Sequence, residues 1–348
     1  MSSPRPRLLV ALRPSEELDS ALAEALPAIP WGYAASTGTA DRADIEAMLV
    51  GSVERELGDF DPSSTPRLRF VQRIYTGLDG FPFERFPPPI RVAGNVGGYA
   101  PYVAEGAVAL ALAAARSTVA AHSLVAQGRL RPVPIASTFR GRTALILGYG
   151  SIGREIATRL VGFGMRVVGV NRTGRMMPGV DAIYPSDRLD DALGEADVVF
   201  EARPLTRATR GSLGAAQFAR MRPAAILVNV GRAGTIVEEA LYQHLRDHPE
   251  FRAALDVWWD EGFAEGQLGR RFPWTDLPNL TGSPHNSGSV PEAEAYSLGR
   301  ALENVHRFFR GEEPFYVADP DDYSDTVPPV PTAANRSPVS GGSSAHFR

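Results

Sequence analysis

The segment that most restricts the fold of this 348-residue chain is a glycine-rich hexapeptide, G-Y-G-S-I-G, at residues 148–153. It follows an apolar run at residues 144–147 and precedes an amphipathic stretch at 154–161. A strand, a tight glycine turn and a helix in this order arrange backbone N–H groups and a helix N-terminus around a pyrophosphate. The hexapeptide therefore predicts a dinucleotide-binding turn in a parallel α/β sheet. The residues expected to contact the dinucleotide are Gly148, Gly150, Ser151, Ile152 and Gly153.

Short apolar runs alternate with helical or loop segments on both sides of the hexapeptide. From residue 143 onward, the predicted strands cover residues 143–148, 166–171, 197–202, 225–230 and 253–257. Before residue 95, strands at 7–12 and 68–72 accompany a helix at 16–26, and a last helix is predicted at 292–309. Strands that alternate with helices form parallel sheets covered on both faces. The length fits two such domains of roughly 100–200 residues each.

Two residue types are absent, and their absence excludes several kinds of chemistry. All 36 basic residues are arginine, and the chain has no cysteine. Without lysine there is no Schiff base and no phosphate-loop or kinase lysine. Without cysteine there is no disulfide, thiol nucleophile, iron–sulfur cluster or cysteine zinc site. The chemistry must rest on histidine, carboxylates, arginine, hydroxyls, backbone groups or a bound cofactor, and no metal site is predicted.

Charge and hydrophobicity narrow the expected partners and location. A formal net charge of −4 argues against a general nucleic-acid binder, which needs a basic face. No apolar stretch approaches the roughly 18 residues that a membrane span needs. The N-terminal residues hold one short apolar run and no cleavage pattern. We therefore expect a cytoplasmic protein that binds neither nucleic acid nor membrane.

The end of the predicted strand at residues 166–171 bears on the choice of cofactor. An acidic side chain at this position binds the ribose hydroxyls of NAD. This chain has the neutral Asn171 followed by Arg172, which would attract the additional phosphate of NADP. Arg175 and Arg203 either add positive charge nearby or are solvated surface residues. The hypothesis is that the chain binds NADP or NAD, with NADP favoured.

Four later segments occur in an order and spacing that resemble a known enzyme family. They are the predicted strand at 197–202 with the Pro-Leu-Thr turn and Thr209 that follow it, N-V-G-R-A-G-T-I-V-E-E-A-L at 229–241, L-D-V-W-W-D-E at 255–261 and S-P-H-N-S-G at 283–288. Together with the hexapeptide they resemble the D-2-hydroxyacid dehydrogenase family over residues 68–323. The resemblance implies that the cofactor is also lined by Arg203, Pro204, Thr209 and Val230.

The resemblance further implies a catalytic set of Arg232, Glu261 and His285. Reduction of a carbonyl by a nicotinamide needs a hydride donor, a proton donor near neutral pKa and a cation for the substrate carboxylate. Histidine exchanges protons readily at physiological pH, and a neighbouring carboxylate raises its pKa and fixes its tautomer. Arginine offers a planar fork that matches a carboxylate. His285 would therefore exchange a proton with the carbonyl oxygen, Glu261 would orient His285, and Arg232 would bind the keto acid and polarise its carbonyl.

Further positions follow from the same resemblance. Asp256 would hold the carboxamide of the nicotinamide. The substrate carboxylate would be bound by Arg232 and by the backbone amides of Thr76, Gly77 and Leu78. The chain departs from the family where Ala233 replaces a glycine after the arginine and Gly262 replaces a proline after the acid. Neither change removes a reacting group.

His285 is one of six histidines, and each of the other five is an alternative candidate for the proton donor. His122 lies in an apolar helical stretch and is expected to be packed. The remaining ones lie in polar helical segments or near the C-terminus and are expected to be solvated; they are His244, His248, His306 and His346. The proton donor is therefore assigned to His285 alone.

The predicted fold class is α/β, with a Rossmann cofactor domain inserted in a flavodoxin-like substrate domain, both doubly wound. Residues 1–96 and 288–323 would form the substrate domain, and residues 97–287 the NAD(P)-binding domain. The almost wholly apolar helix at 101–127 is expected to be buried between the domains. Residues 324–348 are predicted to be a disordered tail, because they have too few large apolar side chains to offset chain entropy.

These observations predict an NAD(P)-dependent oxidoreductase that interconverts a 2-keto acid and a D-2-hydroxy acid in the cleft between the domains. The resemblance implies a homodimer formed through the cofactor domain. Two alternatives remain open: a formate or phosphite dehydrogenase of the same fold, and a cofactor-sensing binding protein like the corepressors of this family. Glu261 beside His285 argues against formate dehydrogenase, and the lack of a lysine near Thr76 argues against phosphite dehydrogenase. The corepressors retain the Arg–Glu–His set, so that set does not exclude them.

Overall fold

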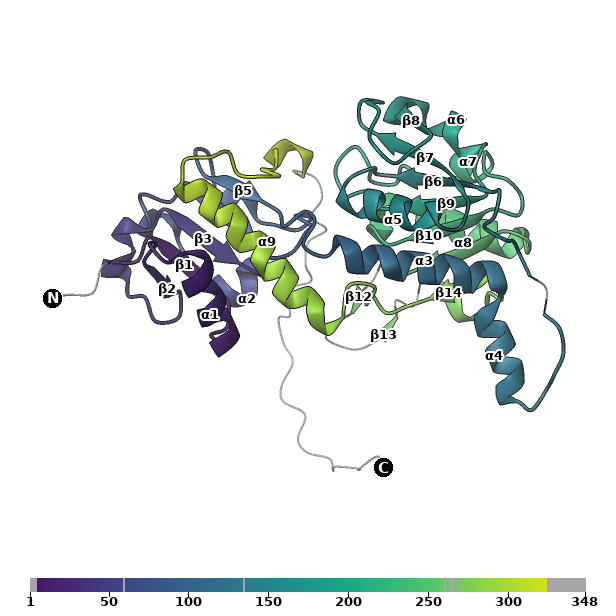
Figure 1. The fold of residues 1–348 in the computed structure, drawn as a ribbon, viewed down its shortest axis with the longest axis horizontal. Coiled ribbons are helices and arrows are strands. Elements are labelled where there is room, and N and C mark those ends of the chain that lie inside the picture. The colour runs from purple at the N-terminus through teal and green to yellow at the C-terminus, as the bar shows by residue number, and fades with distance from the viewer. Residues whose placement is uncertain are drawn as a thin grey trace.

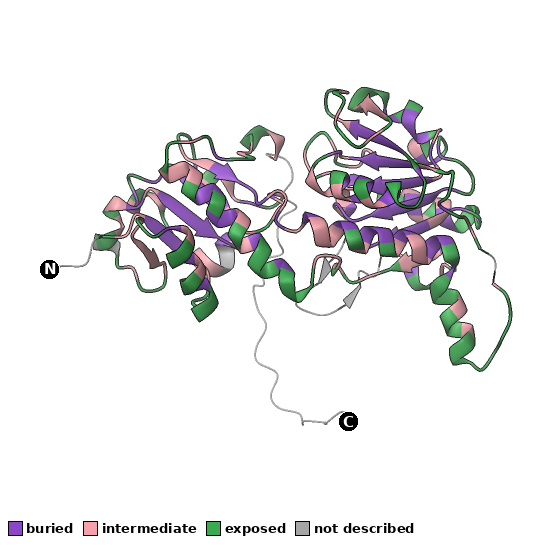
Figure 2. Ribbon diagram, viewed as in Figure 1, coloured by how far each residue is buried: buried purple, intermediate pink, exposed green. Residues whose placement is uncertain are grey.

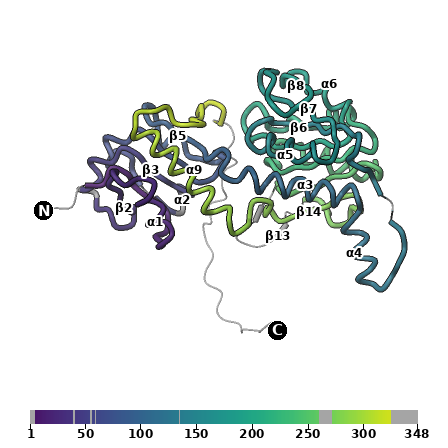
Figure 3. The backbone as a smooth tube through the Cα atoms, in the orientation of Figure 1, coloured from purple at the N-terminus to yellow at the C-terminus, as the bar shows by residue number. Residues whose placement is uncertain are grey.

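The structure is a computed structural model that describes residues 5–58, 60–133, 135–259, 261–262, 267–268 and 271–323. Within this described part, parallel sheets of five and seven strands form the cores of two halves that lie side by side (Figures 1 and 3). The chain passes from one half to the other at the start of α3 (Ala100–Arg116) and returns before α9 (Pro291–Phe309). The predicted α/β class with two doubly wound units is confirmed.

The five-stranded half has the strand order β2-β1-β3-β4-β5. Its strands are β1 (Leu8–Ala11), β2 (Trp31–Tyr33), β3 (Ala47–Val50), β4 (Phe70–Arg73) and β5 (Arg91–Ala93). Helices α1 (Glu16–Ala25) and α9 pack together on one face and bury leucines such as Leu22 and Leu302 there. A short helix, α2 (Val53–Leu57), follows β3. The sequence predicted β1, α1, β4 and α9 but did not single out β2, β3 and β5.

The seven-stranded half has the strand order β14-β11-β10-β9-β6-β7-β8. Its strands are β6 (Thr143–Leu147), β7 (Arg166–Asn171), β8 (Ala182–Pro185), β9 (Val198–Glu201), β10 (Ile226–Asn229), β11 (Arg252–Leu255) and β14 (Leu280–Gly282). The helices that follow strands in this half are α5 (Ser151–Val161), α6 (Leu189–Leu193), α7 (Ala215–Phe218) and α8 (Glu238–Asp247). The five strands predicted here are confirmed. The edge strands β8 and β14 were missed because they are half-exposed and lack a continuous apolar run.

Smaller elements complete the described part. A two-stranded antiparallel hairpin pairs β12 (Glu261–Gly262) with β13 (Gln267–Leu268). Short 3-10 helices lie at Thr39–Asp44, Pro62–Ser64, Phe83–Arg85, Ser186–Arg188, Ala233–Thr235, Trp274–Asp276 and Pro320–Asp322. The central strands of both sheets are buried, whereas the helices expose their outer faces (Figure 2).

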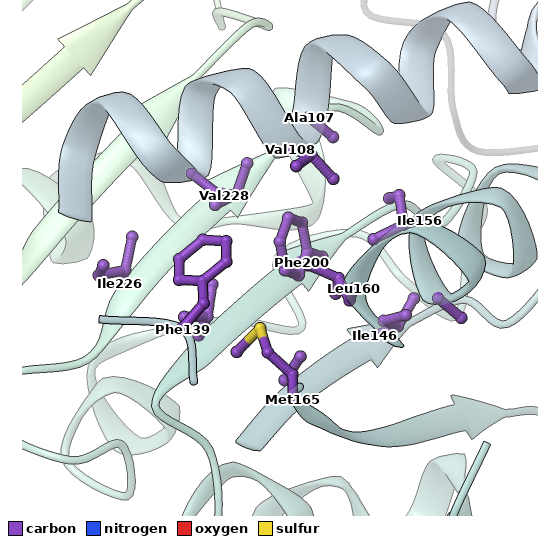
Figure 4. Close-up of a cluster of buried hydrophobic side chains, with 14 of the residues drawn as sticks. Ala107, Val108, Phe139, Ile146, Ile156, Leu160, Met165, Phe200, Ile226 and Val228 are labelled. Atoms are coloured by element: carbon purple, nitrogen blue, oxygen red, sulfur yellow. The ribbon is translucent and has the colours of Figure 1, made fainter. Parts of the chain in front are cut away.

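Helix α3 lies directly on the seven-stranded sheet, as the small size of its residues allows. Ala107 and Val108 face Phe200 and Val228 of the sheet in one continuous hydrophobic cluster (Figure 4). Alanines at the buried positions let the helix backbone approach the strands closely, and α5 packs beside it. This packing fixes the position of α5, whose N-terminus forms part of the predicted cofactor site.

The prediction of one buried helix over residues 101–127 is wrong in its second half. Ser117 takes a left-handed backbone conformation with φ of 52°, and α4 (Thr118–Ala126) leaves at 65° to α3. Arg252 stabilises the break, because its Nη1 donates to the carbonyl of Ala114 at 3.1 Å and to Ser117 Oγ at 2.6 Å. No periodic pattern reveals such a break, because it depends on one residue and a distant arginine.

Helix α4 is largely exposed, in contrast to α3. It has no buried residue, and His122, which was expected to be packed, is exposed. In the described part of the chain, no single helix is long and apolar enough to cross a membrane. Helices α3 and α4 reach the required length only as a bent pair.

Candidate active site

The glycine-rich turn after β6 has the geometry of a ligand cradle. Gly148 has a φ of +89°, and a Cβ atom there would lie 2.8 Å from Arg203 Cγ. A Cβ atom at Gly153 would lie 2.4 Å from the carbonyl oxygen of Gly148. Both positions therefore require glycine for packing reasons. A Cβ atom at Gly150 would meet nothing within 4 Å, so this glycine leaves open space above the turn.

The N-terminus of α5 faces this space. Among the described contacts, the backbone N–H groups of Ser151 and Ile152 donate to no protein acceptor. Unpaired N–H groups at a helix N-terminus favour a phosphate group. The predicted cofactor residues of the hexapeptide are thus brought together, and they fit the diphosphate of a dinucleotide.

Arg203 is neither a free cation nor a surface residue. Its guanidinium forms an ion pair with Glu201, at 2.5 Å between Nη2 and Oε2, and the Glu201 side chain is fully buried. Burial lowers the pKa of Arg203, but the Glu201 carboxylate outweighs this effect and raises it. A Cβ atom at Gly231 would lie 2.7 Å from the Arg203 carbonyl oxygen. The pair therefore supports both glycine turns and adds no net positive charge for a cofactor.

Asn171 and Arg172, at the end of β7, have different roles. Asn171 Oδ1 accepts from the backbone N–H groups of Thr173 and Gly174 at 3.1 and 2.7 Å, so its side chain shapes the loop. The Arg172 side chain is 87% exposed and lies 4.0 Å from the carboxylate of Asp322. Arg172 is therefore accessible to a ligand, whereas the polar atoms of Asn171 are already engaged.

The other predicted cofactor positions lie around the ends of β9 and β10. Thr209 Oγ1 donates to the carbonyl of Pro204 at 2.6 Å and accepts from the N–H of Thr206 at 2.9 Å, which holds the Pro-Leu-Thr turn in shape. The Val230 side chain is buried in the core next to the sheet. Thr209 and Val230 thus stabilise the segments that border the predicted cofactor site. Any contact of these segments with a cofactor would come from backbone groups or from Pro204.

Arg232 reaches from the seven-stranded half to a loop of the five-stranded half. Its Nε donates to both carboxylate oxygens of Asp79, at 3.0 Å each, and its Nη1 donates to the Gly231 carbonyl at 2.9 Å. A Cβ atom at Gly77 would lie 2.0 Å from Arg232 Nη2, so a larger residue there would displace the guanidinium from this position. Arg232 and the predicted substrate loop, far apart in sequence, are brought together.

Asp79 is a residue of this site that the sequence did not single out. It lies one residue beyond the predicted Thr76-Gly77-Leu78 segment, so the signal was adjacent but was not weighed. Its carboxylate holds the guanidinium by Nε and orients the fork toward Gly77. Asp79 is therefore a positioning residue for Arg232.

The loop at residues 76–78 offers donors beside this arginine. Thr76 Oγ1 donates to the Asn95 carbonyl at 3.1 Å, and Arg73 Nη1 donates to the Gly77 carbonyl at 2.6 Å. Within the described part of the chain, the backbone N–H groups of Thr76, Gly77 and Leu78 donate to no protein acceptor. Open N–H groups next to an arginine fork form an arrangement suited to a carboxylate.

The loop that carries His285 is held by Asp256. Asp256 is buried; its Oδ1 accepts from Ser283 Oγ at 2.6 Å and from the N–H of Asn286 at 3.0 Å, and its Oδ2 accepts from the N–H of Ser287 at 3.2 Å. His285 has a φ of +55°, a conformation that is costly for this residue and is maintained by its surroundings. Asp256 therefore positions the histidine loop, and about one of its four acceptor sites remains for a carboxamide.

The remaining predicted positions are those of Glu261 and of the histidines other than His285. The Glu261 backbone lies in β12, but its side chain is outside the described part of the structure, as is His346. His248 and His306 are exposed as predicted. His244 is not solvated: its ring lies 4.6 Å from that of Phe251, and burial lowers its pKa to about 4.

The chain is similar to known proteins in both sequence and fold. The family model described as "D-isomer specific 2-hydroxyacid dehydrogenase, NAD binding domain" matches residues 108–287. Glyoxylate reductase of Aeropyrum pernix is 34% identical over 263 residues, which cover 72% of this chain and 76% of that protein. Hydroxypyruvate reductase of Thermotoga maritima is 29% identical over 269 residues, covering 77% and 85% of the two chains. The NADPH-dependent glyoxylate/hydroxypyruvate reductase of Sinorhizobium meliloti, solved with NADP and sulfate, has a TM-score of 0.73 and 26% identity, covering 91% of this chain and 99% of that one.

Proposed function

The chain belongs to the D-isomer specific 2-hydroxyacid dehydrogenase family, and we propose that it reduces small 2-keto acids to D-2-hydroxy acids with NADPH. The observation that carries the proposal is the contact of Arg232 with the loop at residues 76–79, because an arginine fork beside open backbone N–H groups suits a carboxylate. The names of the relatives, glyoxylate reductase and hydroxypyruvate reductase, support a small keto acid.

The residues of this chain bind the two reactants from opposite halves. The N–H groups at the start of α5 and the space above Gly150 would hold the diphosphate of the cofactor, which supplies the hydride when bound. Arg232 would bind the keto acid carboxylate together with the N–H groups of Gly77 and Leu78. The same guanidinium would polarise the carbonyl, and Asp79 would keep it oriented.

Proton transfer is assigned to the histidine loop. His285 would donate a proton to the carbonyl oxygen during reduction and accept it in the reverse reaction. Asp256 would hold the loop in place through its bonds to Ser283, Asn286 and Ser287, and it would also contact the nicotinamide carboxamide. Glu261 would favour the protonated form of His285 and orient its ring.

A substrate panel tests this function. The purified protein is assayed with glyoxylate, hydroxypyruvate, pyruvate and a larger keto acid, each with NADPH and with NADH. We expect turnover of the small keto acids. Formate and phosphite, assayed with the oxidised cofactors, serve as substrates of the rival dehydrogenases. Tight binding of NADPH without turnover of any keto acid would contradict the proposal and favour a cofactor sensor.

The preference for NADPH is proposed from Arg172. Its exposed guanidinium follows β7, at the position where an acidic residue would bind the ribose of NAD. Replacement by glutamate (R172E) is expected to lower kcat/KM for NADPH about thirtyfold, because a charge-assisted phosphate contact becomes a repulsion. NADH should be used within about twofold of the wild-type rate, because it lacks that phosphate.

Steady-state kinetics with both cofactors check this expectation. R188E is the matched control, because Arg188 is also exposed but lies beyond β8. If R172E leaves the ratio of kcat/KM for NADPH to kcat/KM for NADH unchanged, Arg172 does not select the cofactor.

We propose that the predicted homodimer forms through α4 and the residues that directly follow it, here called the arm. This arm carries apolar side chains in water: Val125 is 60% exposed, Leu130 is 93% exposed and Ile135 is 55% exposed. Figure 1 shows α4 pointing away from the rest of the seven-stranded half. A recess of about 480 Å³ lies at its base, between Val119 and Leu280, and could take apolar side chains of a second copy. Exposed apolar surface of this kind is typical of an interaction site.

The substitution L130R is expected to convert the dimer to a monomer, because it would bury an unpaired charge in an apolar interface. Light scattering coupled to size-exclusion chromatography measures the mass. V161R is the control, because Val161 is 59% exposed and lies at the end of α5, not on α4. A wild-type monomer, or an L130R variant that remains a dimer, would contradict the arm as the interface.

A further inference from the structure

Helix α9 carries an arginine, Arg300, that has no role in the proposed mechanism. The helix begins on the side of the seven-stranded half and packs on the five-stranded sheet (Figure 1). Arg300 Nη1 donates to Glu303 Oε2 at 2.8 Å, and both side chains are partly exposed. Among the contacts of the described residues, Arg300 Nε and Nη2 donate to no protein acceptor. Two nitrogens of this guanidinium are therefore available to a ligand.

The position of Arg300 is fixed by the segment in which the chain first passes from one half to the other. The buried Asn95 donates from Nδ2 to the backbone carbonyl and to Oγ of Ser297, at 2.8 Å each. Ser297 and Arg300 are three residues apart on α9, so they lie on the same side of the helix. At the start of α3, the Pro101 carbonyl accepts from Arg159 Nη2 of α5 at 3.0 Å. The crossing segment therefore holds both α9 and α5.

Gly97, in the same segment, lies between Arg300 and the N-terminus of α5. It has a φ of +100°, a conformation that favours glycine. The nearest neighbours of a Cβ atom there would be Arg300 Nη2 at 3.7 Å, Ser151 Cβ at 3.9 Å and Arg300 Nε at 4.0 Å. The two available nitrogens of Arg300 and the first residue of α5 thus border one space, which a side chain at position 97 would fill.

A phosphate group in this space would meet donors from both halves. The N–H groups of Ser151 and Ile152 are unpaired in the described contacts, and a helix N-terminus favours an anion. A guanidinium forms charge-assisted hydrogen bonds with phosphate, with N–O distances of about 3 Å. Arg203 cannot supply this charge, because its Nε and Nη2 both bond to the buried Glu201. The cation from α9 is therefore the better candidate for the diphosphate.

We infer that Arg300 is a cofactor-binding residue, whose Nε and Nη2 donate to the diphosphate of the dinucleotide. This inference rests on cofactor binding at the glycine-rich turn, as in the proposed function. The diphosphate is then bound by both halves, because α5 supplies backbone N–H groups and α9 supplies the cation. Arg300 contacts a group that NADPH and NADH share, whereas Arg172 is assigned to the phosphate that NADPH alone carries. Substitutions of the two arginines therefore have different effects on the two cofactors.

The test measures the Kd values of NADPH and NADH by fluorescence titration without a keto acid, and that of ADP-ribose by displacement of NADPH. R300M removes the guanidinium, so all three Kd values should rise about tenfold. Between about 50 and 300 mM NaCl, Kd should rise less steeply in R300M than in the wild type, because one cation–phosphate contact is lost. R300K should recover part of both effects. R310M is the control, because Arg310 pairs with Glu312 directly after α9.

The outcomes separate this inference from the proposed function. Equal weakening of the three ligands in R300M, with a flatter salt dependence and no such change in R310M, supports the role of Arg300. Unchanged Kd values or a loss confined to NADPH overturn it, and so does a weakening that keeps the wild-type salt dependence, which a structural role would produce. A wild-type protein that binds NADPH but reduces no keto acid overturns the proposed function alone, because the binding test needs no substrate. A wild-type protein that binds none of the three ligands overturns both.

Discussion

Replacement of His285 by alanine is expected to lower kcat for keto acid reduction about a thousandfold while the Kd for NADPH stays within about twofold. The carbonyl oxygen gains negative charge as the hydride arrives, and the imidazolium is the group assigned to protonate it. General acid–base groups contribute about a hundredfold to ten thousandfold, which sets this magnitude. Cofactor binding should survive, because the N–H groups at the start of α5 are independent of the histidine loop.

A second substitution separates loss of the proton donor from distortion of the loop. His285 has a φ of +55°, which asparagine tolerates better than alanine does, so H285N keeps the backbone conformation. Both variants should be inactive to the same extent if the imidazole is the proton donor. H306A is the matched control, because His306 is exposed on α9. Near-normal turnover in H285N would remove His285 from the mechanism.

Replacement of Arg232 by alanine is expected to lower kcat/KM for a keto acid at least about a thousandfold. The change removes both the charge partner of the substrate carboxylate and the group that polarises the carbonyl. It also leaves Asp79 without the guanidinium that its two oxygens accept from at 3.0 Å, so a carboxylate would face the incoming substrate carboxylate. R232K should recover only part of the activity, because an ammonium cannot bond to Asp79 and to the substrate as a planar fork does.

Steady-state kinetics of R232A, R232K and a control measure this effect. R222A is the control, because Arg222 is paired with Asp197 at a surface position of the same half. The effect of R232A should appear mainly in kcat/KM for the keto acid, with the Kd for NADPH little changed. Equal losses of kcat/KM in R232A and R222A would show that the activity depends on general surface charge and not on a contact of Arg232 with the substrate carboxylate.

The order of strands and helices was largely predictable, because it depends on local apolar runs. The strands β6, β7, β9, β10 and β11 are buried and four to six residues long, so their apolar sequences are distinctive. The break at Ser117 was not predictable, because α3 and α4 are both apolar and the break is stabilised by Arg252 from a distant strand. The exposure of α4 was missed for the same reason.

The site was predictable in its residue types but not in its internal contacts. The resemblance named Arg232 and the loop at residues 76–78, and the structure brings them together across the two halves. Asp79 was missed because its role exists only when Arg232 reaches the loop. The Glu201–Arg203 pair was missed because an arginine after a strand looks the same in the sequence whether it is solvated or paired with a buried carboxylate. The roles of the site residues, the domain boundaries, the dimer and the cytoplasmic location stay predictions.

Chiral analysis of the product tests the central claim most directly. Hydroxypyruvate is reduced with NADPH by the wild-type protein, and the glycerate formed is resolved into its enantiomers. The account predicts D-glycerate, formed in equal amount to the NADPH oxidised. Formation of L-glycerate, or tight binding of NADPH with no reduction of hydroxypyruvate, glyoxylate or pyruvate, would contradict it.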